Sequence, residues 1–350
     1  MDNERQDQVN ILIVKLSAIG DVIHTLPSLA ALRRLYPDAH ITWVVEEAAA
    51  YIVKNHPYLN EVIVSQRKSW SKDIQNSNLL KPLFNMRSLI KELRRRRYDL
   101  VIDFHGLFKS SIIVLLSSGK RKLGYDSLQE LSGLFLNEKI PEDMNKHAVD
   151  RYLDFPRYLG SNVINAEFIL PINEKVEANT QLLLNQYGLE DKNFIAINPV
   201  AYWETKLWDD DNFARLADLI KRNLKLDVVF TGSEKSTTER ITSKMETEGI
   251  NLGGQTTLLE LACLYKKARF VITTDSGPMH LAAAVGTPVV ALFGPTDPAR
   301  TGPYGEGHTI IRTDLPCSPC FLKKCPTKQC MKEILPEQVF TVVENKLTKR

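Results

Sequence analysis

Short runs of apolar and β-branched residues alternate with helical patterns along most of this 350-residue chain. Such runs are typical of strands buried on both faces of a parallel sheet, with the intervening helices covering it. The alternation occurs twice, once before about residue 160 and once after about residue 190. The sequence therefore predicts an α/β protein with two doubly wound parallel sheets. The expected strands are Ile11–Lys15, Ile41–Val45, Leu100–Phe104, Phe194–Asn198, Asp227–Thr231, Arg269–Thr273 and Val289–Phe293. The expected helices include Val22–Tyr36, Met86–Arg97, Asp210–Asn223, Leu258–Lys267 and Met279–Val285.

The stretch between the two alternations divides the chain. Ile169–Asn179 carries a proline and several charges, which is typical of a connector, and a helix is expected directly after it at Thr180–Tyr187. We therefore expect an N-terminal domain over residues 1–170, a C-terminal domain over 171–335, and a final helix over 336–350 that packs back on the N-terminal domain. With 43% apolar residues the composition is that of a globular protein. No apolar run reaches the roughly 18 residues of a membrane span, and the polar start has no signal-peptide pattern, so a cytoplasmic protein is expected.

Positive charge is concentrated in one stretch. Between Gln66 and Arg97 the chain has ten Lys or Arg residues and two acidic ones, although its whole net charge is only +3. Such a basic belt favours an anionic partner, and an anionic membrane surface is one candidate because each basic residue near it contributes ~1 kcal/mol. For Arg94–Arg97 a solvated helix face is the alternative. No nucleic-acid-binding motif accompanies the belt, so nucleic acid is not expected as a partner.

The loops after the strands carry the candidate chemistry, because doubly wound sheets bind ligands beyond the carboxyl ends of their strands. After the first strand, Ser17, Gly20 and Asp21 suit a tight turn into a helix. Asp21 is either a helix cap or a general base at this edge. The turn lacks a G-x-G-x-x-G pattern, which excludes the dinucleotide fingerprint.

Two loops in the second half suit a phosphate. Asp275, Ser276 and Gly277 open a short helix after the sixth expected strand, and His280 follows one turn later. Backbone N–H groups and the positive dipole end at such a helix start favour an anion, although an ordinary capped helix would look the same. Lys206 lies among aromatic residues after the fourth expected strand. It either neutralises a phosphate or covers a tryptophan face.

Four of the five cysteines form a cluster, Cys317-x2-Cys320-x4-Cys325-x4-Cys330. Four thiols so close together have the ligand count of a structural zinc or iron site, although the spacing matches no zinc signature closely. Reduced loop thiols are an equal alternative, and disulfides are less expected in a reducing cytosol.

Taken together, these segments resemble the heptosyltransferases of glycosyltransferase family 9. The resemblance covers most of the chain and rests on V-K-L-S-A-I-G-D-V-I-H-T-L-P at 14–27, T-K-L-W at 205–208, T-D-S-G-P-M-H-L at 274–281 and F-G-P-T-D-P at 293–298. Two further stretches, 103–111 and 147–151, are similar to the heptosyltransferase I branch, which adds the first heptose to the Kdo sugars on lipid A.

This resemblance implies a GT-B fold, in which two Rossmann-like domains face each other across a cleft, with the acceptor on the first and ADP-heptose on the second. It implies an inverting transfer of heptose to a Kdo/heptose acceptor of the lipopolysaccharide inner core, with no cofactor required for catalysis. The enzyme would be cytoplasmic and peripheral on the inner membrane. Alternatives are a relative with another donor sugar or acceptor position, and a non-catalytic nucleotide-sugar-binding assembly protein.

The resemblance also implies roles for individual residues. Asp21 would be the general base. Donor contacts would fall to Lys206, Asp275, Ser276, Gly277, His280, Thr256, Ala201, Tyr202 and either Glu234 or Glu239. Acceptor contacts would fall to Ser17, Gly20, Arg67, Lys68, Lys72, Lys109 and Arg151.

Overall fold

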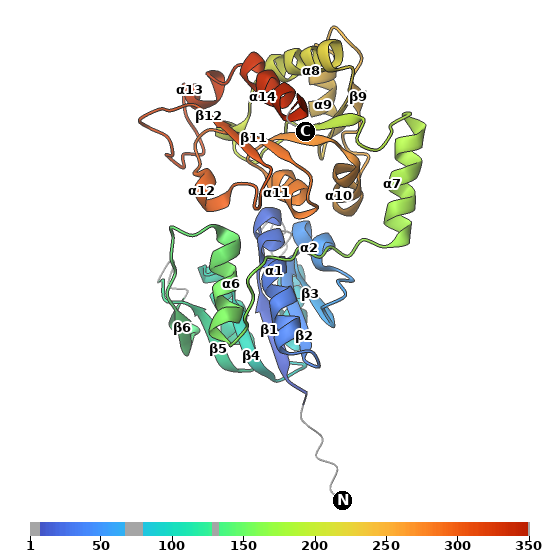
Figure 1. Ribbon diagram of the computed structural model, residues 1–350. Coiled ribbons are helices and arrows are strands. Elements are labelled where there is room, and N and C mark those ends of the chain that lie inside the picture. Colours follow the sequence, from blue (N-terminus) through green and yellow to red (C-terminus); the bar gives the residue numbers. More distant parts are fainter. Residues whose placement is uncertain (1–7, 67–79, 128–132, 349–350) are drawn as a thin grey trace, which may run out of the picture. The chain divides into compact units, whose positions relative to one another are not determined.

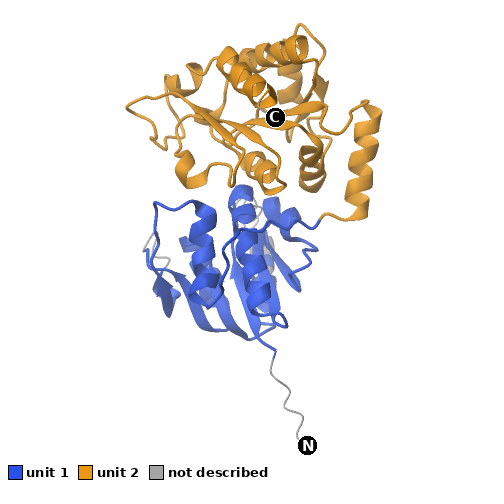
Figure 2. Ribbon diagram, in the orientation of Figure 1, with its two compact units in different colours: residues 1–171 blue, residues 172–350 orange. Residues whose placement is uncertain are grey.

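The chain divides into two compact units, residues 1–171 and 172–350 (Figures 1 and 2). The structure, a computed structural model, describes residues 8–66, 80–127 and 133–348. Each unit contains a six-stranded sheet in which every neighbouring pair of strands is parallel. The predicted fold class of two doubly wound α/β units is confirmed.

The sheet of unit 1 has the strand order β3-β2-β1-β4-β5-β6, which is that of a Rossmann fold. Its helices lie on both faces. The apolar sides of α4 and α5 cover one face, packing on side chains of β1, β2, β3 and β4, while α1 and α6 pack against each other. The elements are β1 Asn10–Val14, α1 Ile19–Leu35, β2 His40–Glu46, α2 Glu47–Val53, β3 Glu61–Ser65, α4 Leu80–Leu93, β4 Tyr98–Asp103, α5 Phe108–Leu116, β5 Gly119–Tyr125, β6 Glu138–Ile140 and α6 Ala148–Tyr158.

The sheet of unit 2 repeats this order as β9-β8-β7-β10-β11-β12. Helices α8 and α14 cover one face, and α10 packs between α7 and α11. The elements are α7 Glu174–Gln186, β7 Phe194–Asn198, a 3₁₀ turn Glu204–Lys206, α8 Asp210–Leu224, β8 Asp227–Phe230, α9 Lys235–Thr242, β9 Ile250–Asn251, α10 Leu258–Lys267, β10 Phe270–Thr274, α11 Gly277–Ala284, β11 Val289–Phe293, α12 Pro298–Thr301, β12 Thr309–Arg312, α13 Gln329–Lys332 and α14 Pro336–Thr348.

The C-terminal helix, in the stretch 336–350 that was expected to pack back on the N-terminal domain, contributes to the core of unit 2. Val339 and Val343 of α14 are fully buried in the same cluster as the apolar residues of α8. The indole Nε1 of Trp208 donates to the carbonyl of Ile334 at 2.9 Å and holds the chain just before the helix. The apolar face of α14 is therefore already used within its own unit.

Helix α7 begins earlier than the expected start at Thr180. The side chain of Asn173 accepts a hydrogen bond from the N–H of Val176 at 3.0 Å and caps the helix there. Acidic residues in the first turn, Glu174 and Glu177, add a favourable interaction with the helix dipole. Local capping thus converts half of the expected connector into helix.

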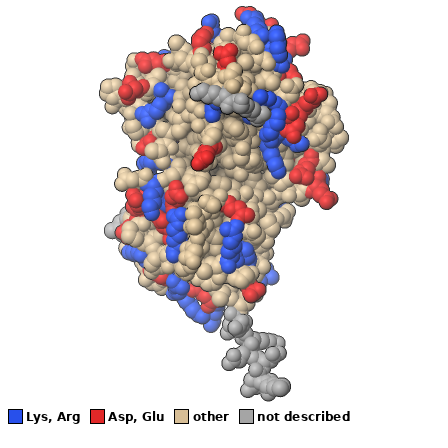
Figure 3. Space-filling view, viewed as in Figure 1, with Lys and Arg blue, Asp and Glu red and all other residues tan. Residues whose placement is uncertain are grey.

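The distribution of charged side chains and the lengths of the helices bear on whether the protein contacts or crosses a membrane. On the face shown in Figure 3, Lys and Arg side chains are interspersed with Asp and Glu over both units. Within the basic belt, Arg95 and Arg96 lie 3.9 and 3.5 Å from the carboxylate of Glu61. Among the described residues, no helix is long and apolar enough to cross a membrane.

Candidate functional site

The candidate residues lie at equivalent places in the two sheets. In each sheet the connections diverge between two central strands, β1 and β4 in unit 1 and β7 and β10 in unit 2. We call this place the switch point, and in open α/β sheets it is where a ligand crevice forms. Asp21 follows β1 and Lys109 follows β4, whereas Lys206 follows β7 and Asp275 follows β10. Each unit therefore brings a carboxylate and a lysine to its switch point.

Asp21 caps the helix that follows β1. It is the third residue of α1, and its Oδ2 accepts a hydrogen bond from the N–H of Ala18 at 3.1 Å. Its side chain is partly exposed, and Gly20 beside it is buried in the first turn. The cap engages one carboxylate oxygen, so the other is available to a hydroxyl at this edge.

Lys109 is held next to the Asp21 loop by two partners. Its ammonium donates to Ser17 Oγ at 2.7 Å and to Glu46 Oε1 at 3.2 Å. Glu46 ends β2 and is buried. Sequence reasoning did not single out Glu46, because an acidic residue at a strand end looks the same whether it is solvated or paired. The predicted acceptor contacts Ser17 and Lys109 are thus brought together around a buried carboxylate.

A buried lysine directly after β1 was also missed. Lys15 is 3% exposed, and its ammonium donates to the carbonyl of Phe104 at 3.0 Å and to the hydroxyl of Tyr152 at 2.6 Å. Burial lowers the pKa of Lys15, and the nearby carboxylates of Asp21 and Asp103 oppose that shift. The available signal was a charged residue closing an otherwise apolar strand.

The structure describes one other predicted acceptor-binding side chain, that of Arg151, and does not place it where it could contact a ligand. Arg151 is only 7% exposed, and its guanidinium donates to Glu142 Oε1 at 2.8 Å. That burial and pairing point to a packing role within unit 1. Arg67, Lys68 and Lys72 lie outside the described residues.

The switch point of unit 2 centres on a buried ion pair. Lys206 Nζ lies 2.6 Å from Asp275 Oδ2, with side chains 15% and 5% exposed. The hydroxyl of Thr296, which follows β11, donates to the same carboxylate oxygen at 2.6 Å. The Lys206 ammonium also lies 4.5 Å from the ring centre of Trp203, so it contacts a carboxylate and an aromatic face together. Lys206 therefore covers a tryptophan face, as one interpretation of the sequence expected, while its partner here is a carboxylate and its contact with a phosphate stays a prediction.

The start of α11 adjoins this ion pair. Ser276 is the N-cap residue and Gly277 the first residue of the helix, with a proline in its first turn. The first N–H groups of a helix have no partners within it, and they point along the positive end of the dipole. His280, one turn into the helix, is buried. An ammonium and a helix start thus lie side by side, as a phosphate site requires.

The remaining predicted donor contacts come from three further segments. Tyr202 is almost fully exposed and Ala201 partly so, on the loop after β7. Thr256 is partly exposed just before the Thr257 cap of α10. Glu234, at the N-cap position of α9, follows β8 at the carboxyl edge of the sheet. Glu239 lies farther along α9 and pairs with Lys235 at 3.2 Å.

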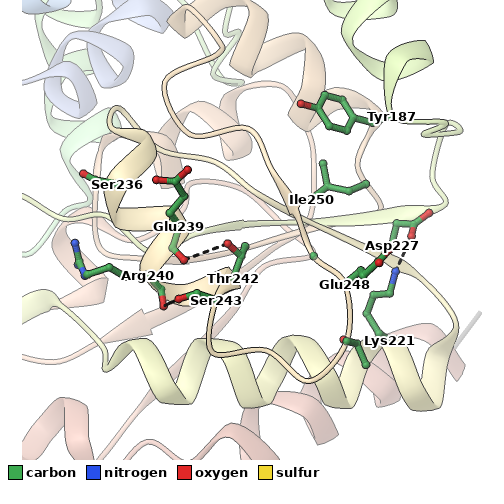
Figure 4. A pocket seen from close by; sticks show the side chains of 12 residues that line it. Tyr187, Lys221, Asp227, Ser236, Glu239, Arg240, Thr242, Ser243, Glu248 and Ile250 are labelled. Atoms are coloured by element: carbon green, nitrogen blue, oxygen red, sulfur yellow. Dashed lines mark hydrogen bonds and ion pairs between the residues drawn. The ribbon is translucent and has the colours of Figure 1, made fainter.

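Glu239 faces a broad pocket at the opposite edge of the sheet (Figure 4). Asp227 and Ile250, which line this pocket, are the first residues of β8 and β9, so it lies at the amino ends of the strands. Its volume is about 1090 Å³. Two of its charged side chains neutralise each other, since Lys221 Nζ lies 3.0 Å from Asp227 Oδ1. This pocket is therefore separate from the switch point.

The cysteine cluster lies beside the switch point of unit 2. Cys317 is exposed, and the other three are partly exposed, all with free thiols. In the described part of the chain, no group of three or more His, Cys, Asp or Glu side chains is arranged to hold a metal ion. The structure thus gives no support to the predicted zinc or iron site.

Comparison with known proteins gives consistent matches over most of the chain. The family model described as glycosyltransferase family 9 (heptosyltransferase) matches residues 86–331. Lipopolysaccharide heptosyltransferase 1 of Pseudomonas aeruginosa is 30% identical, over 96% of this chain and 97% of the relative. The lipopolysaccharide core heptosyltransferase OpsX of Haemophilus influenzae is 25% identical, over 86% and 84%.

Solved structures match the fold of this chain over nearly its whole length. A family 9 glycosyltransferase from Veillonella parvula superposes with a TM-score of 0.83 at 25% identity, over 98% of each chain. The Escherichia coli heptosyltransferase WaaC, solved with ADP, superposes with a TM-score of 0.78 at 25% identity, over 97% of this chain and 100% of that one.

Proposed function

This chain belongs to glycosyltransferase family 9, the heptosyltransferases, and we propose that it transfers heptose from ADP-heptose to a Kdo/heptose acceptor of the lipopolysaccharide inner core with inversion. The observation that carries the proposal is the Lys206–Asp275 pair beside the start of α11 at the switch point of unit 2. WaaC, a solved relative, has been determined with ADP and with ADP-2-deoxy-2-fluoro heptose.

The roles proposed for the donor-binding residues follow from the negative charge that develops on the leaving group. When the sugar leaves, negative charge develops on the β-phosphate of ADP. In this proposal the Lys206 ammonium and the N–H groups at Ser276 and Gly277 stabilise that charge and so lower the barrier. Of the two candidate glutamates we assign the ribose contact to Glu234, because it lies at the carboxyl edge whereas Glu239 faces the opposite pocket.

The acceptor half rests on Asp21. The second carboxylate oxygen of Asp21 takes the proton of the acceptor hydroxyl while the oxygen of that hydroxyl forms its bond to the anomeric carbon of the heptose. A helix N-terminus stabilises negative charge, so proton transfer comes late, when the hydroxyl has already been acidified by bond formation. Ser17 and Lys109, held by Glu46, are proposed to contact the anionic acceptor beside it.

The test of this function is release of ADP. The protein, mixed with ADP-heptose and lipopolysaccharide extracted from a heptose-deficient strain, is expected to release ADP and to add one heptose by mass. Asp21→Asn keeps the cap acceptor and should lose ~10²–10⁴-fold in turnover while ADP binding is retained. Glu47→Gln, an exposed acid in the first turn of α2, is the matched control. Acceptor-independent ADP release, or full turnover by Asp21→Asn, would contradict the proposal.

We further propose that unit 1 docks on an anionic membrane surface. Phe108, Ile112 and Leu115 are exposed along α5, and their spacing places them on one helix face. This helix packs against α4, whose C-terminal end leads into Arg94–Arg97. Apolar side chains beside clustered cations suit a lipid interface.

Sedimentation with vesicles tests the membrane proposal. Binding to phosphatidylglycerol vesicles should fall with added salt and should weaken in an Ile112→Asp/Leu115→Asp variant. Leu182→Asp changes a more exposed leucine on α7 of unit 2 and should leave binding unchanged. Equal binding to neutral vesicles at all salt concentrations would refute the electrostatic part of the proposal.

A further inference from the structure

The cysteine-bearing stretch 313–330, named here the Cys segment, packs onto the chain that leaves β11. The N–H of Cys320 donates to the carbonyl of Pro295 at 3.0 Å. A Cβ placed on Gly294 would lie 3.0 Å from Cys330 Sγ, so that thiol rests against the Gly294 backbone. Cys320 and Cys330 therefore lie against two consecutive residues.

One connection from this packing leads to Lys206. Thr296 directly follows Pro295, and its hydroxyl donates to Asp275 Oδ2 at 2.6 Å. The same oxygen lies 2.6 Å from Lys206 Nζ. The position of the ion pair therefore depends on where the Cys segment holds residues 294–296.

A second connection reaches Lys206 from its own loop. The buried hydroxyl of Thr205 donates to the carbonyl of Leu322 in the Cys segment at 2.7 Å. The ammonium of Lys323 lies 5.4 Å from the ring centre of Trp203, the ring that Lys206 also contacts. Both sides of the ion pair are thus linked to the Cys segment through neighbouring residues, Thr205 next to Lys206 and Thr296 next to Pro295.

We propose that the Cys segment is a thiol-modification site that controls donor binding, in which oxidation joins Cys320 to Cys330. Both thiols are free and partly exposed, as this chemistry requires. Forming the bond draws the Cys330 sulfur from Gly294 toward Cys320, and the movement passes to Lys206 through both connections. This proposal rests on the donor role given above to Lys206.

The chemistry balances with a peroxide as the two-electron oxidant. The Cys320 thiolate attacks one peroxide oxygen, forming a sulfenic acid and releasing the other oxygen as water after proton uptake. The Cys330 thiolate then attacks the sulfenic sulfur, and the hydroxyl leaves as a second water. Two thiols lose two electrons and two protons, and hydrogen peroxide is reduced to two waters.

Calorimetric titration of ADP into the full chain tests the inference. Affinity for ADP should fall about tenfold after hydrogen peroxide treatment, within the roughly 5–150-fold range of coupled sites, and return after dithiothreitol. Peptide mapping should find the Cys320–Cys330 disulfide. Cys320→Ser/Cys330→Ser should bind ADP like the reduced protein and ignore peroxide, while Cys317→Ser/Cys325→Ser should still respond.

The outcomes separate the two proposals. A reduced protein that does not bind ADP refutes the donor role of Lys206 itself. A reduced protein that binds ADP, and binds it equally well when the disulfide has formed, refutes only the control by thiols. A peroxide response that survives in Cys320→Ser/Cys330→Ser also refutes it, and Cys263→Ser serves as the check on the buried thiol of α10.

Discussion

Replacing Lys206 by methionine should destabilise unit 2, because the buried carboxylate of Asp275 loses the cation with which it is paired. Asp275 is 5% exposed, and the ammonium lies 2.6 Å from it. Removing one partner of a buried pair leaves an uncompensated charge and costs about 3–5 kcal/mol. Lys206 itself is 15% exposed, and Thr296 still donates to the carboxylate, so we expect the lower end, about 3 kcal/mol.

Thermal unfolding followed by calorimetry measures this loss. For a unit of this size, about 3 kcal/mol corresponds to a fall in Tm of roughly 6–12 °C. Lys206→Met/Asp275→Asn removes the charge as well and should recover most of the loss. ADP at about 100 times its Kd should stabilise the unmodified protein by about 2.7 kcal/mol and Lys206→Met by much less.

The matched control is Lys267→Met. Lys267 lies 3.5 Å from Asp191, and both side chains are largely exposed, so this ion pair should contribute at most about 1 kcal/mol. Two results would refute the reasoning. One is a Lys206→Met Tm within about 1 °C of the parent protein, and the other is a double variant no more stable than Lys206→Met.

Three further predictions concern stability. Burial lowers the pKa of His56 to about 4 in the folded protein, whereas its pKa in the unfolded chain is near 6.5. As the pH falls below 6.5, the unfolded chain therefore binds a proton before the folded protein does. Stability is therefore full above that pH and falls by up to about 3 kcal/mol toward pH 4, an effect absent in His56→Gln under urea unfolding. Trp208→Phe loses the hydrogen bond to Ile334 and should speed hydrogen exchange in α14, at a cost of about 1–3 kcal/mol. Gly253→Ala places a Cβ 2.1 Å from Thr238 Oγ1 and 3.0 Å from the Glu234 carbonyl, so it should cost about 1–3 kcal/mol in thermal unfolding.

The sequence predicted the central strands well because burial on both faces leaves a strong compositional mark. Strand β11 is wholly apolar, β1 and β7 each have one polar residue at an end, and β10 consists of apolar and β-branched residues. The sequence did not predict the four edge strands, β3, β6, β9 and β12, or β5, which lies next to the edge strand β6. Gly119–Tyr125 carries three basic residues, and Ile250–Asn251 is only two residues long, so neither shows an apolar run. Pairing with a neighbour already in the sheet, rather than local composition, makes these segments strands.

The candidate site was located by the rule that ligands bind beyond the carboxyl ends of the strands. The residues that contact the site residues could not be predicted from the sequence. Loops after strands could be examined one by one, which located Asp21, Lys206 and Asp275. The contact of Lys15 with Tyr152 joins residues 137 positions apart, and that of Thr296 with Asp275 joins residues 21 apart. Only the folded chain brings such residues together, because local composition does not show which loops and helices will pack against each other.

The two switch points share one electrostatic design. In unit 1 the Lys109 ammonium is paired with buried Glu46, and in unit 2 the Lys206 ammonium is paired with buried Asp275. A carboxylate that holds a lysine in place fixes the position of the cation before any anionic ligand arrives, so little reorganisation is needed at binding. It also competes with the ligand for the ammonium, which lowers the net gain in affinity. These pairs therefore favour positioning over tight binding, which agrees with the proposed reaction, in which ADP and a glycosylated product are both released.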